Sequence, residues 1–158
     1  MAVVLCRRSR FNPLPFMTRE QLQVREFMLR AGQECPLKPK IPSKEVRELR
    51  VKLIAEELIE LALAYNVNLV IVAGGVHVKA GEETGCNLVE AYDATLDLEV
   101  VVRGNGVAMG VDPEPGWEEV HRSNMTKFID GFRREDGKWV KGPSYSPANL
   151  GPILEAQK

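Results

Sequence analysis

Apolar residues recur at helical spacing in four stretches of the chain, and capping residues mark where several of these stretches begin. Thr18, followed three residues later by Gln21, has the form of a capping box, which predicts a helix start. Ser43 is a good N-cap for a second helix, the longest periodic segment in the sequence. The four predicted helices cover residues 18–31, 43–66, 87–111 and 117–129.

Two β-branched runs flank Gly74 and Gly75 in the segment NLVIVAGGVHV. This pattern is typical of a small hairpin with a tight glycine turn. A short apolar run can equally be a buried helix, so the sequence leaves strand and helix open for residues 68–80. The expected fold is therefore an all-α bundle of about four main helices, with a candidate β-hairpin insert between the second and third.

The end of the chain, residues 130–158, is rich in glycine, proline and basic residues. It predicts a long loop and tail, with a short last helix starting at Ser146 or Pro147. We find no internal repeat and no composition shift that marks a second domain. The whole chain, residues 1–158, is expected to form a single domain.

Composition excludes several classes of function. The 21 basic and 22 acidic residues give a formal net charge of -1, so no global charge favours nucleic acid or an anionic membrane. No apolar run is long enough to cross a bilayer, and MAVVLCRRSR reverses the order of a secretory signal. Cys6, Cys35 and Cys86 lack CxxC spacing and are expected to be reduced thiols. We therefore expect a cytoplasmic protein with no membrane and no stable nucleic acid partner.

Acidic residues occur on the apolar stripes of two predicted helices. In KLIAEELIEL, Glu56, Glu57 and Glu60 lie within or at the margin of the arc of apolar residues. On the third helix, Asp93 and Asp97 lie within about 60° of the centre of its apolar stripe. A solvated face is the usual explanation for one acidic pair, but two such clusters on apolar stripes argue for acids that face inward.

Five carboxylates in one packed site would repel each other by several kcal/mol, or take up protons, unless cations lie between them. Oxygen ligands without cysteine or a nearby histidine favour Mg²⁺, with Mn²⁺ as the usual substitute. Mg²⁺ often takes its remaining ligands from phosphate oxygens. The pattern therefore predicts a site that processes nucleotides.

Two longer segments carry a resemblance to a known family. ATLDLEVVVRGNGVAMGVDPEPGWEEVHRSNMTKF and RREDGKWVKGPSYSPANL, together with EELIE, resemble the MazG-like branch of the all-α nucleoside triphosphate pyrophosphohydrolases. This superfamily includes MazG, phosphoribosyl-ATP pyrophosphohydrolase and the dimeric dUTPases. The resemblance covers roughly Val46 to Leu150. It implies a bundle completed by dimerisation, as a homodimer or dimer of dimers, and Mg²⁺-dependent cleavage of a nucleoside triphosphate to the monophosphate and pyrophosphate.

The resemblance also implies a ligand set. Glu56, Glu57 and Glu60 of EELIE, with Asp97 of LDLEV, match the metal ligands of the family. The family's ExxD spacing is not kept here, because Ala94 stands three residues before Asp97 and the nearest acid is Asp93. The number of metal ions and the last ligand stay open, and Asp93 can act directly or through a water molecule.

Substrate contacts are expected from the segment HRSNMTK and the tail. Asn124 and Lys127 lie three residues apart on one helix face, where they can bind phosphate oxygens. Tail residues can either close over the triphosphate or form a solvated run of charge. Aromatic residues can either stack on a base or anchor a small core. The tail cations are Arg133, Arg134, Lys138 and Lys141, and the aromatic residues are Trp117, Trp139 and Tyr145.

The predicted function is a Mg²⁺-dependent nucleoside triphosphate pyrophosphohydrolase that removes non-canonical or excess nucleotides. Glu57 would orient or deprotonate the attacking water, and Lys127 would assist on the leaving side. The sequence leaves open the substrate, with dUTP or a related pyrimidine nucleotide suggested by the resemblance. It also leaves open a non-catalytic metal-binding scaffold and a partner-binding module, although Asn124 and Lys127 beside the acids argue against both.

Overall fold

The computed structural model describes residues 17–73 and 75–158, so the N-terminal segment MAVVLCRRSR, Cys6 and Gly74 lie outside the described residues. The described chain is mostly helical with two small antiparallel sheets, which confirms the predicted helical class. The elements are α1 (Arg19–Arg30), α2 (Lys44–Ala64), β1 (Val67–Val72), β2 (Gly75–Ala80), η1 (Glu83–Gly85), α3 (Leu88–Met109), α4 (Glu114–Met125), α5 (Lys127–Asp130), β3 (Phe132–Arg133), β4 (Trp139–Val140) and α6 (Leu150–Glu155).

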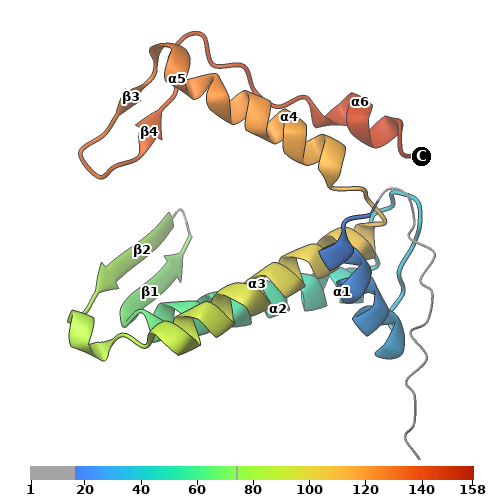
Figure 1. Cartoon of the computed structure of the whole chain (residues 1–158), viewed down its shortest axis with the longest axis horizontal. Coiled ribbons are helices and arrows are strands. Elements are labelled where there is room, and N and C mark those ends of the chain that lie inside the picture. Colours follow the sequence, from blue (N-terminus) through green and yellow to red (C-terminus); the bar gives the residue numbers. More distant parts are fainter. Residues whose placement is uncertain (1–16, 74) are drawn as a thin grey trace, which may run out of the picture.

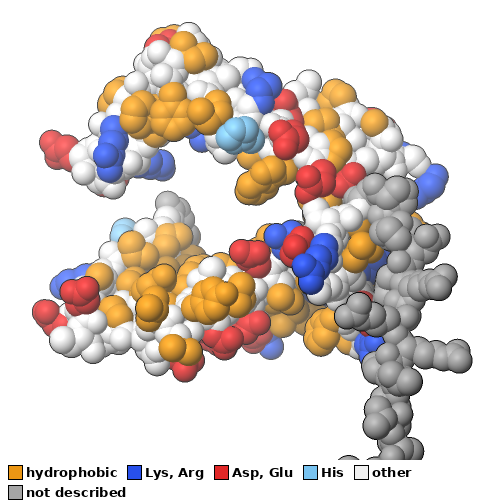
Figure 2. Space-filling view, in the orientation of Figure 1, with side chains coloured by type: hydrophobic (Ala, Val, Ile, Leu, Met, Phe, Trp, Pro, Cys, Tyr) orange, Lys and Arg blue, Asp and Glu red, His pale blue; other side chains and the backbone are white. Residues whose placement is uncertain are grey.

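These elements form two arms that meet at the end of α3 (Figure 1). In the first arm, the long helices α2 and α3 pack against each other, α1 packs on α3, and the β1–β2 hairpin extends from α2. In the second arm, α4 packs on α5 and α6, and the β3–β4 hairpin lies at the far end. The space-filling view shows a hollow between the arms and apolar side chains along both of them (Figure 2).

The buried core is small and lies where α1, α2 and α3 meet. Met28 and Val107 are almost fully buried there, and Val46 of α2 packs against them. Gly104 of α3 lies close to a side chain of α2. A Cβ at this position would lie 2.9 Å from Nη1 of the buried Arg50, so the missing side chain makes room for the guanidinium.

The two helix starts predicted at Thr18 and Ser43 are confirmed, with one change of role for Gln21. The Thr18 hydroxyl accepts from the backbone N–H of Gln21 at 3.1 Å, and the Ser43 hydroxyl accepts from that of Val46 at 3.3 Å. The Gln21 side chain does not complete the capping box. It is buried and donates to the carbonyl of Val111 at 2.9 Å, so it ties α1 to the end of α3.

The hairpin interpretation of residues 68–80 is confirmed, because β1 and β2 pair antiparallel with Val70 opposite His77. The two described cysteines, Cys35 and Cys86, are free thiols as expected. Within the described ranges, no helix is both long and apolar enough to cross a membrane.

Three predicted boundaries are wrong in the second half of the chain. The helix expected over 117–129 begins at Glu114 and ends at Met125, where Thr126 turns its hydroxyl back to the carbonyl of Ser123 at 2.7 Å. The segment expected to be loop contains the β3–β4 hairpin, in which Phe132 pairs with Val140. The last helix begins at Leu150 instead of Ser146 or Pro147.

Candidate active site

A cavity of about 340 Å³ lies between the C-terminal half of α2 and the N-terminal half of α3. Acids from both helices line it: Glu60 from α2, and Glu90 and Asp93 from α3. Asn87 caps α3 by accepting from the backbone N–H groups of Val89 and Glu90 at 3.0 and 3.3 Å, which fixes Glu90 in the first turn. Because Glu90 and Asp93 are one turn apart, they share a helix face toward α2.

Glu57, one turn before Glu60, has the environment that most needs a cation. Its Oε2 is buried and makes no hydrogen bond among the described residues. Desolvation raises the pKa of this carboxyl, and the negative charges of neighbouring acids raise it further. Those neighbours are Glu60, Asp97, Glu56 and Asp93. A carboxylate in this position is disfavoured unless positive charge compensates it.

The other predicted ligands are less enclosed than expected. Glu56, Glu60, Asp93 and Asp97 are exposed in the single chain, so the expectation that all five acids face inward is wrong. Glu56 lies 3.4 Å from the ammonium of Lys52 on the same helix. In the described part of the chain, no three His, Cys, Asp or Glu side chains lie close enough to hold a metal ion as they stand.

Glu90 is a candidate ligand that the sequence analysis missed. The departure from ExxD spacing arose because the motif was aligned on Asp97, which puts Ala94 at its first position. Aligned on Asp93, the motif begins at Glu90 and the spacing is kept. The structure favours this alignment, since Glu90 and Asp93 line the same cavity as Glu60. The signal that could have found it is the repeated three-residue spacing of acids on the two helices.

The predicted phosphate-binding residues gather on the second arm. The Lys127 ammonium donates to Oδ1 of Asn124 at 2.7 Å. Lys127 and Lys141 lie 6.0 and 4.1 Å from the centroid of the Tyr145 ring. The pKa of the Tyr145 hydroxyl is lowered, first by its hydrogen bond with Ser123 and then by the two lysines. One cationic group therefore contains four of the predicted substrate contacts: Asn124, Lys127, Lys141 and Tyr145.

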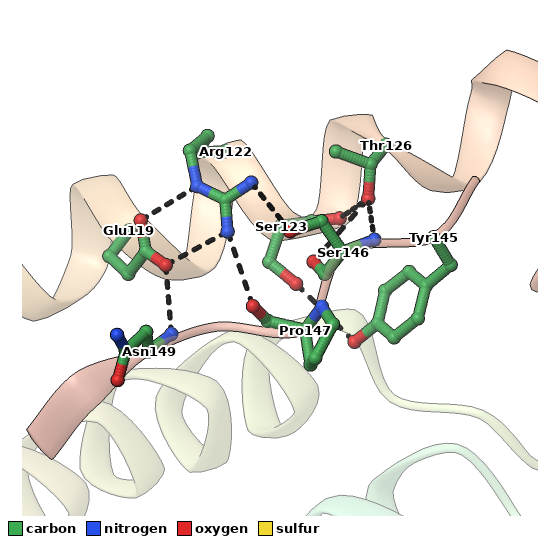
Figure 3. A network of polar contacts seen from close by, with 8 residues as sticks. All are labelled: Glu119, Arg122, Ser123, Thr126, Tyr145, Ser146, Pro147 and Asn149. Carbon is green, nitrogen blue, oxygen red and sulfur yellow. Dashed lines mark hydrogen bonds and ion pairs between the residues drawn. The ribbon is translucent and has the colours of Figure 1, made fainter.

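A polar network holds the C-terminal loop against α4 (Figure 3). Arg122 donates to both carboxylate oxygens of Glu119 at 2.7 and 2.9 Å and to the carbonyl of Pro147 at 3.2 Å. Glu119 also accepts from the backbone N–H of Asn149 at 2.8 Å. The Arg122 hydrogen bond, followed by that from Asn149, lowers the pKa of Glu119 to about 2. Because Tyr145 lies in this loop, the network also positions the cationic group.

The hairpin of the second arm carries the remaining predicted cations. Arg133 and Lys138 are exposed there, whereas Arg134 lies 2.6 Å from Asp136. Trp139 donates from Nε1 to the carbonyl of Lys127 at 2.6 Å, and its ring centroid is 4.8 Å from that of Phe128. Trp139 is therefore an anchor for the hairpin and not a free surface for a base.

The two sets of residues lie on different arms. The acids belong to α2 and α3, and the cationic group belongs to α4, α5 and the loop that follows them (Figure 1). Each set is assembled by packing within its own arm. A polyphosphate would need both sets, since Mg²⁺ ions neutralise one side of it and ammonium groups the other.

A family comparison assigns the chain. Residues 24–124 match the model of the family described as PRA-PH, phosphoribosyl-ATP pyrophosphohydrolase, and this range includes every acid of α2 and α3 discussed above and Asn124. A search of curated proteins finds no match. The matched range is well over half of the chain, and the family is a member of the MazG-like all-α superfamily. The chain therefore belongs to the phosphoribosyl-ATP pyrophosphohydrolase family, and it is a pyrophosphohydrolase that acts on phosphoric anhydrides.

Proposed function

We propose that this enzyme is a Mg²⁺-dependent pyrophosphohydrolase that cleaves a nucleoside triphosphate to the monophosphate and pyrophosphate. The observation that carries the proposal is the buried Oε2 of Glu57, which makes no hydrogen bond among the described residues. Four further carboxylates act on it, and acids of the same cluster line a cavity with Glu90. Hard oxygen donors of this kind fit Mg²⁺, or Mn²⁺ in its place.

The residues that would hold the metal are Glu57 and Glu60 of α2 with Glu90 and Asp93 of α3. When bound, Mg²⁺ supplies charge neutralisation at the phosphate oxygens and acidifies the attacking water. Asp97 and Glu56 contribute negative charge around this set. The position of Glu56 beside Lys52 favours an outer role for it.

In the proposed reaction, a water oxygen forms a bond to the α-phosphorus while the bond from that phosphorus to the α–β bridging oxygen breaks. Pyrophosphate leaves with the electron pair of the broken bond. Glu57 accepts the proton of the water as the general base of the proposed reaction. Lys127, oriented by its hydrogen bond to Asn124, stabilises the charge that develops on the leaving group.

Two substrate classes fit this chemistry. The family model is described by phosphoribosyl-ATP, and the predicted class is canonical or non-canonical nucleoside triphosphates, including dUTP and related pyrimidine nucleotides. Both carry the same triphosphate, and they differ in what is attached beyond it. The positively charged group would bind the triphosphate that both classes share. We propose the nucleoside triphosphates, in a role that removes unwanted nucleotides, on the resemblance of the chain to the MazG-like branch.

The test is a panel of nucleoside triphosphates and phosphoribosyl-ATP with Mg²⁺, in which pyrophosphate and orthophosphate are measured separately. We expect pyrophosphate without orthophosphate, and at least a 100-fold loss of rate in Glu60→Gln. The matched control is Glu48→Gln on the same helix, where the exposed Glu48 lies 3.7 Å from Lys44. Full activity of Glu60→Gln, or release of orthophosphate alone, would reject the proposal.

We also propose that the functional unit is a homodimer. The chain exposes 12206 Å², whereas a folded monomer of its 17.6 kDa mass exposes about 7,900 Å². An excess of exposed surface is expected of a chain that covers part of its surface with a second copy.

Exposed apolar side chains mark where this area lies, and both arms carry them (Figure 2). On the first arm they are Leu63, Leu88, Val89, Tyr92, Leu96 and Val100, and on the second arm Trp117, Met125, Phe128, Ile129 and Phe132. Apolar surface of this extent on facing elements is typical of protein interfaces. Light scattering at several protein concentrations checks the dimer, and a monomer at micromolar concentration would contradict it.

A further inference from the structure

We propose that Asn66 is a positioning residue of the metal site, because its side chain fixes how α2 and α3 present their acids to each other. The inference rests on the proposed function, since it concerns the same acids. Glu60 belongs to α2, whereas Glu90 and Asp93 belong to α3, and all three line one cavity. The β1–β2 hairpin and η1 separate the two helices in the sequence (Figure 1). A connection of this length does not by itself set the spacing of the helices that it joins.

Asn66 follows α2 with a backbone conformation that glycine adopts more easily. Its φ is 50°, and among the described residues it is the one residue other than glycine with positive φ. The corresponding positions after α1 and α3 are Gly32 and Gly110, with φ of 73° and 69°. Asparagine tolerates this conformation less well than glycine does. The amide of Asn66 is therefore expected to make a contact that glycine could not make.

That amide lies at the centre of the connection between the two helices. Its Nδ2 donates to the carbonyl of Glu82 at 3.1 Å, and the backbone carbonyl of Asn66 accepts from the N–H of Gly81 at 2.8 Å. Two glycines leave the space that the amide occupies. A Cβ added at Gly81 or at Gly85 would lie 2.8 or 2.9 Å from Cγ of Asn66. Neither glycine has positive φ, so the space and not the backbone conformation requires them. We call these contacts the Asn66 clasp.

The Asn66 clasp leads directly to the residues that place the acids. The carbonyl of Glu82 also accepts from the backbone N–H of Gly85 at 3.0 Å, which ties η1 to the clasp. The N–H of Asn87 then donates to the carbonyl of Ala64, the last residue of α2, at 2.8 Å, while the Asn87 side chain caps α3. Ala64, Gly85 and Asn87 line the cavity beside the acids. The clasp therefore determines how the end of α2 meets the start of α3.

Metal binding makes this spacing important. In the part of the chain that the structure describes, no three acids lie close enough to hold an ion as they stand, so their side chains must turn toward it. Mg²⁺ requires near-octahedral geometry, with oxygen ligands at about 2.0–2.1 Å. A fixed backbone confines the adjustment to side-chain rotation, which lowers the cost of binding. Loss of a residue that supports metal ligands in this way typically weakens metal binding by about 10- to 100-fold.

Binding of Mn²⁺ alone, measured from the EPR signal of the free ion, tests the inference without turnover. Asn66→Gly removes the amide but also relieves the positive φ, so the metal-free protein should melt close to wild type in EDTA. Its Mn²⁺ affinity should fall by about 10-fold or more. Gly81→Ala keeps the amide but places a methyl group against it, and should weaken binding in the same way although Gly81 does not line the cavity. The matched control is Gly75→Ala in the same hairpin, where an added Cβ meets nothing within 4 Å and the affinity should not change.

The double variant, Asn66→Gly with Gly81→Ala, distinguishes the clasp from two unrelated defects. The methyl group has no amide to displace in this protein, so it should bind Mn²⁺ as Asn66→Gly does. Wild-type affinity in either single variant, or losses that multiply in the double variant, would overturn the inference and leave Asn66 a structural residue only. A wild-type protein that binds no Mn²⁺ would overturn it as well. Failure of the proposed function is distinct, since the wild-type protein would then release no pyrophosphate while Mn²⁺ binding still reports the clasp.

Discussion

Replacing Glu57 should stabilise the metal-free protein, although it removes a central residue of the proposed site. Its Oε2 is buried and has no hydrogen-bond partner among the described residues, and four other acids act on it. A buried polar group left unsatisfied costs about 1–3 kcal/mol. For a chain of this size, 1 kcal/mol corresponds to roughly 2–4 °C in melting temperature. Glu57→Met, which keeps the length of the side chain, should therefore melt about 2–12 °C higher than wild type in EDTA.

The pH dependence of this difference has a defined sign. The folded-state pKa of Glu57 is raised, so the folded protein holds this proton more tightly than the unfolded chain does. Below the ordinary glutamate pKa, the wild type should therefore be as stable as Glu57→Gln. Its free energy of unfolding should fall relative to that of Glu57→Gln as the pH rises through the raised pKa of folded Glu57. Glu57→Gln should match wild type at low pH and exceed it at neutral pH, by less than Glu57→Met because an amide is left without a partner.

The assay is thermal unfolding in EDTA from pH 4 to 8, at one protein concentration so that dimerisation does not shift the comparison. Glu48→Gln is the matched control, because Glu48 is exposed and lies near Lys44 outside the acidic cluster, and its change should stay within about 0.5 kcal/mol. If Glu57→Met melts at or below wild type at pH 7.5, and the Gln variant follows the wild-type pH curve, Glu57 is not an uncompensated carboxylate.

The remaining predictions concern the metal, the loop and the junction. Mg²⁺ at 100 times its dissociation constant should stabilise the wild-type protein by about 2.7 kcal/mol and so raise its melting temperature. Asp93→Asn should lose more of this stabilisation than Asp97→Asn, because Asp93 lines the cavity. Equal losses in a thermal-shift titration would contradict the alignment of the motif on Glu90. The pKa of Glu119 is lowered to about 2, so Glu119 should stabilise the C-terminal loop fully above about pH 4.5 and progressively less as the pH falls toward 2. Hydrogen exchange of the Asn149 amide, which Glu119 accepts from, measures this effect. Unchanged protection of that amide at pH 2 would contradict the prediction. Gly32 and Gly110 both have positive φ, but only at Gly110 would an added Cβ meet a backbone carbonyl. Gly110→Ala should therefore lower the free energy of unfolding in urea more than Gly32→Ala does. Equal decreases would show that backbone strain alone sets the cost.

The helices were predictable because their signals are local. Thr18 and Ser43 supply caps within three residues of the helix starts, and the two β-branched runs around the glycines specify a hairpin. The β3–β4 hairpin gave no such signal. Its strands are two residues long and depend on distant contacts, above all the hydrogen bond from Trp139 to Lys127. A hairpin of this kind is fixed by tertiary structure and not by alternation of side chains.

The acidic residues show a different limit of sequence analysis. Helical phase places Glu60 and Asp97 near apolar neighbours of their own helices, yet both acids are exposed in the single chain. The apolar residues Leu63, Val89 and Leu96 of the same two helices are also exposed. Phase reports which residues share a face, but it does not report whether that face is covered by the same chain or by another one. The acids and these apolar residues are therefore left open together, and a single partner that covers the apolar faces would enclose the carboxylates as well.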